Sequence, residues 1–145
     1  AEWPGKIKPG RVDHHMICNT DLMSTFAEVI GDHLGKHEGE DSYSFYNDLV
    51  EDRSPQPRKS MVLTSGGSGA FVVRDSSWKY IEASQPTRWV QTYYPDGPWI
   101  TQYQLYDIEK DPGERNNLYQ AMPRKAAVLK RIIDRVKHHP GSESK

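Results

Sequence analysis

Apolar residues recur at helical spacing near the start of the chain, in residues 19–31. The apolar face of this predicted helix consists of Leu22, Phe26, Val29 and Ile30. Asn19 or Thr20 is expected to cap the helix at its start, and Gly31 is expected to end it. The flanking residues are polar, so this apolar face requires another surface to pack against.

A second helical pattern covers residues 122–139. Pro123 suits a first helical turn, and Pro140 with Gly141 ends the pattern. The predicted apolar stripe consists of Val128, Ile132 and Val136, with Leu129 and Ile133 beside them. The last turn ends in the basic side chains of Lys137, His138 and His139, which complement the C-terminal end of the helix dipole.

Between the two helical patterns, short apolar runs alternate with polar turns, which is typical of β-strands. The predicted strands cover residues 61–64, 70–74, 78–83 and 102–108. Hairpin-length connections between them imply antiparallel neighbours. We therefore predict an α+β fold, in which a small antiparallel sheet of three to four strands packs with the C-terminal helix.

The pattern divides the chain into four parts. Residues 1–34 form a strand-helix segment, because two Pro-Gly-type breaks in residues 1–12 suggest a strand end that runs into a turn. Residues 35–60 are a polar linker with room for one short helical turn, anchored by Phe45 and Leu49. The predicted sheet and helix form a C-terminal subdomain at 61–139, and residues 140–145 are a tail.

Composition narrows the class of protein. Only 35% of the 145 residues are hydrophobic, which suits either a loop-rich domain or a piece of a larger protein whose remainder covers its apolar faces. The net charge is -1, and the basic and acidic residues are well mixed along the chain, so nucleic acid is not an expected partner. No apolar run approaches the roughly 20 residues that span a bilayer. A single cysteine, Cys18, excludes an internal disulfide.

Four segments together resemble the C-terminal portion of a sulfatase of the arylsulfatase and N-acetylgalactosamine-6-sulfatase type, in the alkaline phosphatase superfamily. They are WPGKIKPG (3–10), NTDLMSTFAEVIG (19–31), FVVRDSSWKYI (71–81) and LYDIEKDPGERNNL (105–118), in the order of that family. Asp21, Leu22, Thr25 and Gly31 match the family's helix pattern at the right spacing. The resemblance covers nearly the whole chain.

The resemblance implies a sulfuric ester hydrolase that acts on sulfated carbohydrates or aryl sulfates. Such enzymes use a formylglycine made from the first residue of a Cys/Ser-x-Pro-x-Arg motif, together with calcium, and both belong to the N-terminal catalytic domain. Cys18 lacks the Pro and Arg of that motif. We therefore expect no catalytic residue and no metal ligand in this chain, and no activity from the chain alone.

The same resemblance makes residues 1–34 an edge segment of the larger α/β domain and implies that the chain packs on the catalytic domain. It also implies a periplasmic or secreted location, or a lysosomal one in a eukaryote. A stand-alone carbohydrate-binding or interaction module is the alternative from a different functional class. A related phosphoesterase or phosphonate hydrolase is a third possibility.

The loop TSGGSGAF (64–71) lacks the Gly-Lys-Ser/Thr ending of a phosphate-binding loop. The resemblance places this hairpin tip at the substrate cleft, where Ser65 and Ser68 would contact a sulfated sugar; a plain turn is the other interpretation. The stretch 86–99 is rich in aromatic residues that suit stacking on sugar rings, or else form a small core under a long loop. The candidates there are Arg88, Trp89, Tyr93, Tyr94 and Trp99.

Histidine pairs raise the question of a metal. His14 and His15 are adjacent, so in a strand they point to opposite faces, and no accompanying carboxylate or thiolate was evident at ligand spacing. We therefore expect no metal site, and expect His14 or His15 to line the substrate pocket of the whole enzyme.

The stretch YDIEKDPGERNNLY (106–119) resembles a metal loop, but Pro112 and Gly113 break it where further ligands should converge. We predict a structural role, with a turn at 111–114 in which Gly113 permits positive φ. Asn116 or Asn117 caps a short turn, and Leu118 anchors the stretch to the core.

Overall fold

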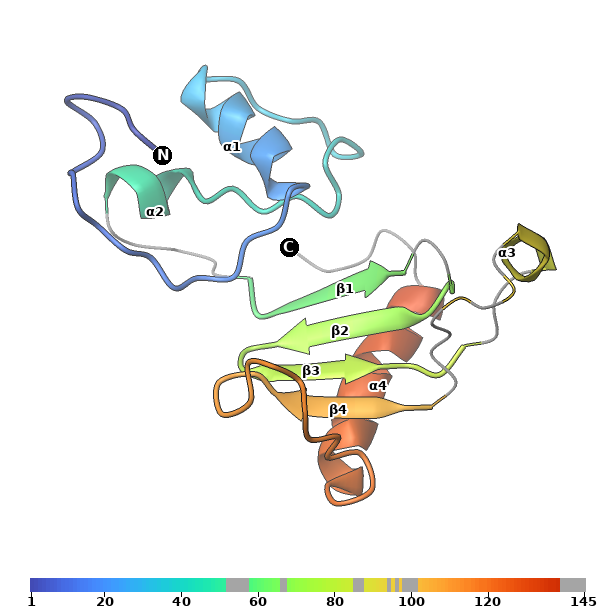
Figure 1. Cartoon of the computed structure of the whole chain (residues 1–145). Coiled ribbons are helices and arrows are strands. Elements are labelled where there is room, and N and C mark those ends of the chain that lie inside the picture. The colour runs from blue at the N-terminus through green and yellow to red at the C-terminus, as the bar shows by residue number, and fades with distance from the viewer. Residues whose placement is uncertain are drawn as a thin grey trace. The chain divides into compact units, whose positions relative to one another are not determined.

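The computed structural model describes residues 1–51, 58–65, 68–84, 88–93, 95, 97 and 102–138. The chain divides into two compact units whose boundary lies between Lys59 and Ser60. The N-terminal unit holds α1 and α2, and the sheet unit holds four strands with α3 and α4 (Figure 1). Within the described residues, every helix is too short or too polar to cross a membrane.

The sheet unit contains one antiparallel sheet in the order β1-β2-β3-β4. Its strands are β1 (Ser60–Thr64), β2 (Phe71–Asp75), β3 (Trp78–Ile81) and β4 (Gln104–Asp107). The β2–β3 connection is two residues long, and Ser76 in it has φ +52, as such tight hairpins require. The predicted α+β fold with an antiparallel sheet is therefore confirmed.

The main core lies between the sheet and α4 (Pro123–His138), which crosses one face of the sheet (Figure 1). The register aligns apolar residues in one row on that face: Val62, Val73, Tyr80 and Leu105. From the helix, Ala126, Leu129 and Ile133 are buried against this row. The predicted stripe was wrong at Val128, which is 50% exposed. The buried side of the helix instead includes Ala126.

A short helix, α3 (Arg88–Tyr93), lies in the aromatic stretch that the sequence suggested was a loop. Its residue Val90 is buried, with 7% of its surface exposed, and anchors the helix. The sequence did not reveal this helix because one turn with a single buried apolar residue has too little periodicity to detect.

The N-terminal unit contains α1 (Asp21–Val29) and α2 (Tyr46–Val50), and both helices were predicted. Residues 1–12 were expected to run from a strand end into a turn. They contain turns, in one of which the amides of Lys6 and Ile7 donate to the Trp3 carbonyl, but they form no strand. A strand requires a neighbouring strand for its hydrogen bonds, and the described part of this unit forms none. Gly31, at φ +74, ends α1 as predicted.

Helix α1 buries its polar side. Thr25 is 1% exposed, and its hydroxyl accepts a hydrogen bond from the Phe45 amide (3.1 Å). Asp21 is equally buried and accepts hydrogen bonds from Arg58 and from the amides of Tyr43 and Cys18. The predicted side-chain cap is absent, since Thr20 at the N-cap makes no capping bond.

The predicted apolar face of α1 is exposed in this structure. The exposed fractions are Leu22 39%, Phe26 59%, Val29 36% and Ile30 76%. Such a contiguous apolar strip on a helix is typical of a surface that another part of a protein covers.

Candidate functional site

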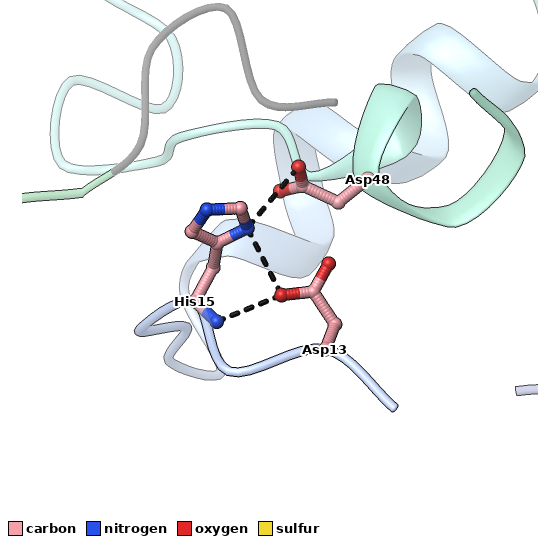
Figure 2. Close-up of side chains that lie close together, drawn as sticks. All are labelled: Asp13, His15 and Asp48. Atoms are coloured by element: carbon pink, nitrogen blue, oxygen red, sulfur yellow. Dashed lines mark hydrogen bonds and ion pairs between the residues drawn. The ribbon is translucent and has the colours of Figure 1, made fainter. Parts of the chain in front are cut away.

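Three ionisable side chains of the N-terminal unit lie together: Asp13, His15 and Asp48 (Figure 2). The Nδ1 atom of His15 is 2.9 Å from Asp13 Oδ1 and 3.4 Å from Asp48 Oδ1. The backbone amide of His15 also donates to Asp13 Oδ1 at 2.7 Å. We call this group the Asp-His-Asp cluster.

Local geometry explains how the cluster forms. Asp13 and His15 are two residues apart in a segment outside the helices and strands, and the Asp13 carboxylate accepts from the His15 backbone amide, which keeps the two side chains close. Asp48 is supplied by α2, and Arg11 holds that helix in place by donating to the Asp48 and Leu49 carbonyls at 2.6 and 2.9 Å. The Asp48 side chain is 8% exposed, whereas that of His15 is 45% exposed.

A pocket of about 490 Å³ adjoins the cluster. Residues of the first turn region, among them Trp3 and Lys8, form most of its lining, and Asp13 and Asp48 belong to its wall. Arg11 lines it as well. The cluster therefore borders a space large enough for a small ligand.

The sequence selected His14, which is exposed in the structure, whereas its neighbour His15 joins the cluster. Neither carboxylate of the cluster was among the predicted site residues. Asp13, two residues before His15, was a detectable signal, because an aspartate side chain readily hydrogen-bonds the backbone two residues further on. Asp48 is 33 residues further along, and only the fold brings it near.

The serine candidates belong to the turn between β1 and β2. Ser68 is 5% exposed; its hydroxyl accepts from the Ala70 amide (3.2 Å) and its carbonyl accepts from the Ser84 hydroxyl (2.9 Å). Ser65 is half-buried, and its amide donates to the Ala70 carbonyl (2.8 Å). The hydroxyl of Ser68 thus acts within the turn, and Ser65 is the more accessible of the two.

The aromatic candidates include an exposed pair on α3. Trp89 and Tyr93, one helical turn apart, are 63% and 64% exposed, and their ring centroids are 5.1 Å apart. Arg88 is exposed at the start of the same helix. Tyr94 and Trp99 lie outside the described residues.

The stretch 106–119 connects β4 with the segment before α4 through hydrogen bonds. The Asn117 carboxamide accepts from the amides of Leu105 (3.1 Å) and Tyr119 (3.0 Å) and donates to the Tyr103 carbonyl (3.1 Å). Glu114 forms an ion pair with Lys79 of β3 at 2.7 Å. These contacts agree with a structural role.

In the predicted turn of this stretch, positive φ occurs at Glu114 (+51) rather than at Gly113. The Asp111 carboxylate closes the turn by accepting from the Asn116 amide at 2.8 Å. Hydrogen bonds from the backbone amides of Asn116 and Arg115 lower the pKa of Asp111 below its ordinary value. The hydrogen bonds of this carboxylate therefore stabilise the turn.

No family model matches the chain. It is 23% identical over 148 residues to an N-acetylgalactosamine-6-O-sulfatase of Bacteroides thetaiotaomicron, a match that covers 94% of this chain and 26% of that protein. It is 24% identical over 156 residues to an ulvan-active sulfatase of Formosa agariphila, covering 92% of this chain and 31% of that protein. The chain resembles sulfatases.

The fold agrees with this resemblance. A solved structure of the protein BT4656, in complex with its substrate D-glucosamine-2-N,6-O-disulfate, superposes with a TM-score of 0.69 at 19% identity. The superposition covers 99% of this chain and 29% of that chain. The chain therefore spans about a quarter to a third of the length of the sulfatases that it matches. The predicted resemblance to the C-terminal portion of a sulfatase is confirmed.

Residues 84–88, Ser-Gln-Pro-Thr-Arg, match the sulfatase Cys/Ser-x-Pro-x-Arg pattern and were not among the predicted site residues. Its residues 85–87 lie outside the described residues. The Ser84 hydroxyl is half-buried and donates to the Ser68 carbonyl in the β1–β2 turn. A pattern with three fixed positions arises by chance, so this match alone does not identify a nucleophile.

Proposed function

We propose that this chain is the C-terminal part of a sulfuric ester hydrolase that acts on sulfate esters of carbohydrates. The observation that carries this proposal is the match of over nine-tenths of the chain to two sulfatases, one named for an N-acetylgalactosamine 6-O-sulfate group and one for ulvan. The substrate bound to BT4656, a sulfated glucosamine, supports the same class of substrate.

The catalytic formylglycine and the calcium site are proposed to lie in a part of the enzyme that this chain does not include. The exposed apolar face of α1 supports this arrangement, because it offers a surface for the catalytic domain to cover. Residues 1–34 would then belong with that larger domain, 35–60 would connect them to the subdomain at 61–139, and 140–145 would be a tail. A periplasmic or secreted location, or a lysosomal one in a eukaryote, is part of the proposal.

Within the whole enzyme, α3 is proposed to face the sugar. Two adjoining exposed rings suit stacking on the C–H face of a pyranose, and a guanidinium suits paired hydrogen bonds to a sulfate group. Trp89, Tyr93 and Arg88 would fill these roles. Ser65, Ser68, Tyr94, Trp99 and His14 complete the proposed substrate-facing set, among which buried Ser68 would contribute by shaping the turn.

The test uses the whole enzyme, matured to carry formylglycine and supplied with calcium. Sulfate released from a panel of sulfated monosaccharides is measured by ion chromatography. Release from at least one sugar is expected, and no release from any sulfate ester would overturn the proposal.

Substrate contact is tested with Trp89→Ala. It should raise KM by up to about tenfold, because loss of a ring-stacking contact costs on the order of 0.5–1.5 kcal/mol. The matched control is Gln91→Ala, on the same helix and also exposed, which should leave KM within about twofold. Equal effects of the two variants would show that α3 does not contact the sugar.

A further inference from the structure

We propose that Asp13, His15 and Asp48 bind one divalent transition-metal ion, of the class to which zinc belongs. Each side chain offers one ligand atom, and the three atoms lie within 4.8 Å of one another. The proposal rests on the N-terminal unit alone and is independent of the proposed sulfatase function. It also differs from the calcium site of that function, because an imidazole is one of the ligands.

The distances suit a coordination sphere. For metal–ligand bonds of about 2.1 Å, neighbouring ligand atoms lie about 3.0 Å apart in an octahedron and about 3.4 Å apart in a tetrahedron. His15 Nδ1 is 2.9 Å from Asp13 Oδ1 and 3.4 Å from Asp48 Oδ1. The third pair, between Asp13 and Asp48, lies within 4.8 Å, so the three side chains converge on a space of the size that one ion occupies (Figure 2).

The donor set indicates which metals fit. Calcium and magnesium prefer oxygen ligands alone, whereas an imidazole with carboxylates suits zinc, manganese or iron(II). The two carboxylates carry a charge of -2, which a divalent ion neutralises. Arg11 brings a positive charge near the site, but its guanidinium donates to the Asp48 and Leu49 carbonyls and thereby also fixes α2.

The site offers an open side. Three protein ligands leave at least one coordination position for water or another small ligand, which is the arrangement of open rather than purely structural zinc sites. The pocket of about 490 Å³ has Asp13 and Asp48 in its wall, so a ligand in that pocket can reach the ion. Without a metal, the same contacts describe an imidazole ring held beside two carboxylates, and this is the competing interpretation.

Isothermal titration calorimetry with zinc chloride on the 145-residue chain tests the proposal. One ion per chain is expected. His15→Ala should weaken binding by about 100-fold or more, since loss of even an outer partner of a metal ligand costs 10–100-fold. His14→Ala is the matched control, because His14 is adjacent and exposed, and it should bind within about twofold of wild type. A chain that binds no zinc, or a His15→Ala variant that binds as tightly as wild type, would overturn the proposal.

Two further measurements separate this site from other outcomes. The exposed pair His37–Glu40 (3.1 Å) is a second place where zinc can bind weakly, so His37→Ala should leave the tight binding unchanged. Loss of tight binding in His37→Ala would contradict the assignment. If His15→Ala fails to fold, nitrogen-15 NMR of the wild-type chain decides, with a zinc-induced shift at His15 Nδ1 expected and a shift confined to other histidines refuting the site.

Discussion

Replacing Asn117 with alanine tests whether the stretch 106–119 is a structural clamp. The substitution removes three hydrogen bonds, to the amides of Leu105 and Tyr119 and to the Tyr103 carbonyl. Leu105 is 0% exposed, so its amide loses a partner that water replaces poorly, at about 1–3 kcal/mol. The other two bonds contribute about 0.5–1 kcal/mol each, so the free energy of unfolding should fall by about 3 kcal/mol.

Urea unfolding followed by circular dichroism measures this loss. With an m-value of about 2 kcal/mol/M, the midpoint should decrease by roughly 1.5 M. Asn116→Ala is the matched control, because Asn116 contributes its backbone amide to this network, and it should change the free energy by less than about 0.5 kcal/mol. A change below about 0.5 kcal/mol in Asn117→Ala, or equal effects of both variants, would refute the structural role.

Three further predictions concern the two units. Burial raises the pKa of Asp21, but hydrogen bonds from Arg58 and two backbone amides outweigh it and leave that pKa below its ordinary 3.8. The ionised Asp21 carboxylate therefore stabilises the folded chain above about pH 4, and this stabilisation is lost as the pH falls further. In urea titrations at several pH values, Asp21→Asn should flatten the decrease of the unfolding free energy in acid. An unchanged decrease would contradict this prediction. Leu129→Ala should lower the free energy of unfolding by about 2–5 kcal/mol, and Val128→Ala should lower it by less than about 1 kcal/mol. The reverse order would contradict the orientation of α4. Phe26→Glu should prevent binding of the chain to a separately produced catalytic domain without lowering helix content by circular dichroism, and unchanged binding would show that α1 is not the contact.

The sheet could be predicted because each strand carries its own signal. The alternation of apolar and polar residues, together with the short polar turns, predicted the ends of β1 to β4 to within about two residues. The face of α4 was harder, since Val128 and Leu129 both belong to one broad stripe and only the sheet selects the side that is buried. α3 was missed because one helical turn has almost no periodicity of its own.

The candidate site shows the same limit of local patterns. Asp13 and His15 are two residues apart, a spacing at which an aspartate side chain reaches the following backbone, so the sequence itself can suggest this pair. Asp48 joins them through the position of α2, which depends on hydrogen bonds from Arg11 that no sequence pattern encodes. Local spacing therefore reveals pairs of ligands, whereas a third ligand from a distant element requires the fold.

Sulfate release by the chain alone and by the whole enzyme tests the central claim most directly. Both are incubated with calcium, formylglycine-maturing enzyme and a chromogenic aryl sulfate, with Ser84→Ala prepared alongside because residues 84–88 match the formylglycine pattern. We expect release by the whole enzyme, release that persists in its Ser84→Ala variant, and none from the chain alone. Turnover by the isolated chain, abolished by Ser84→Ala, would contradict it.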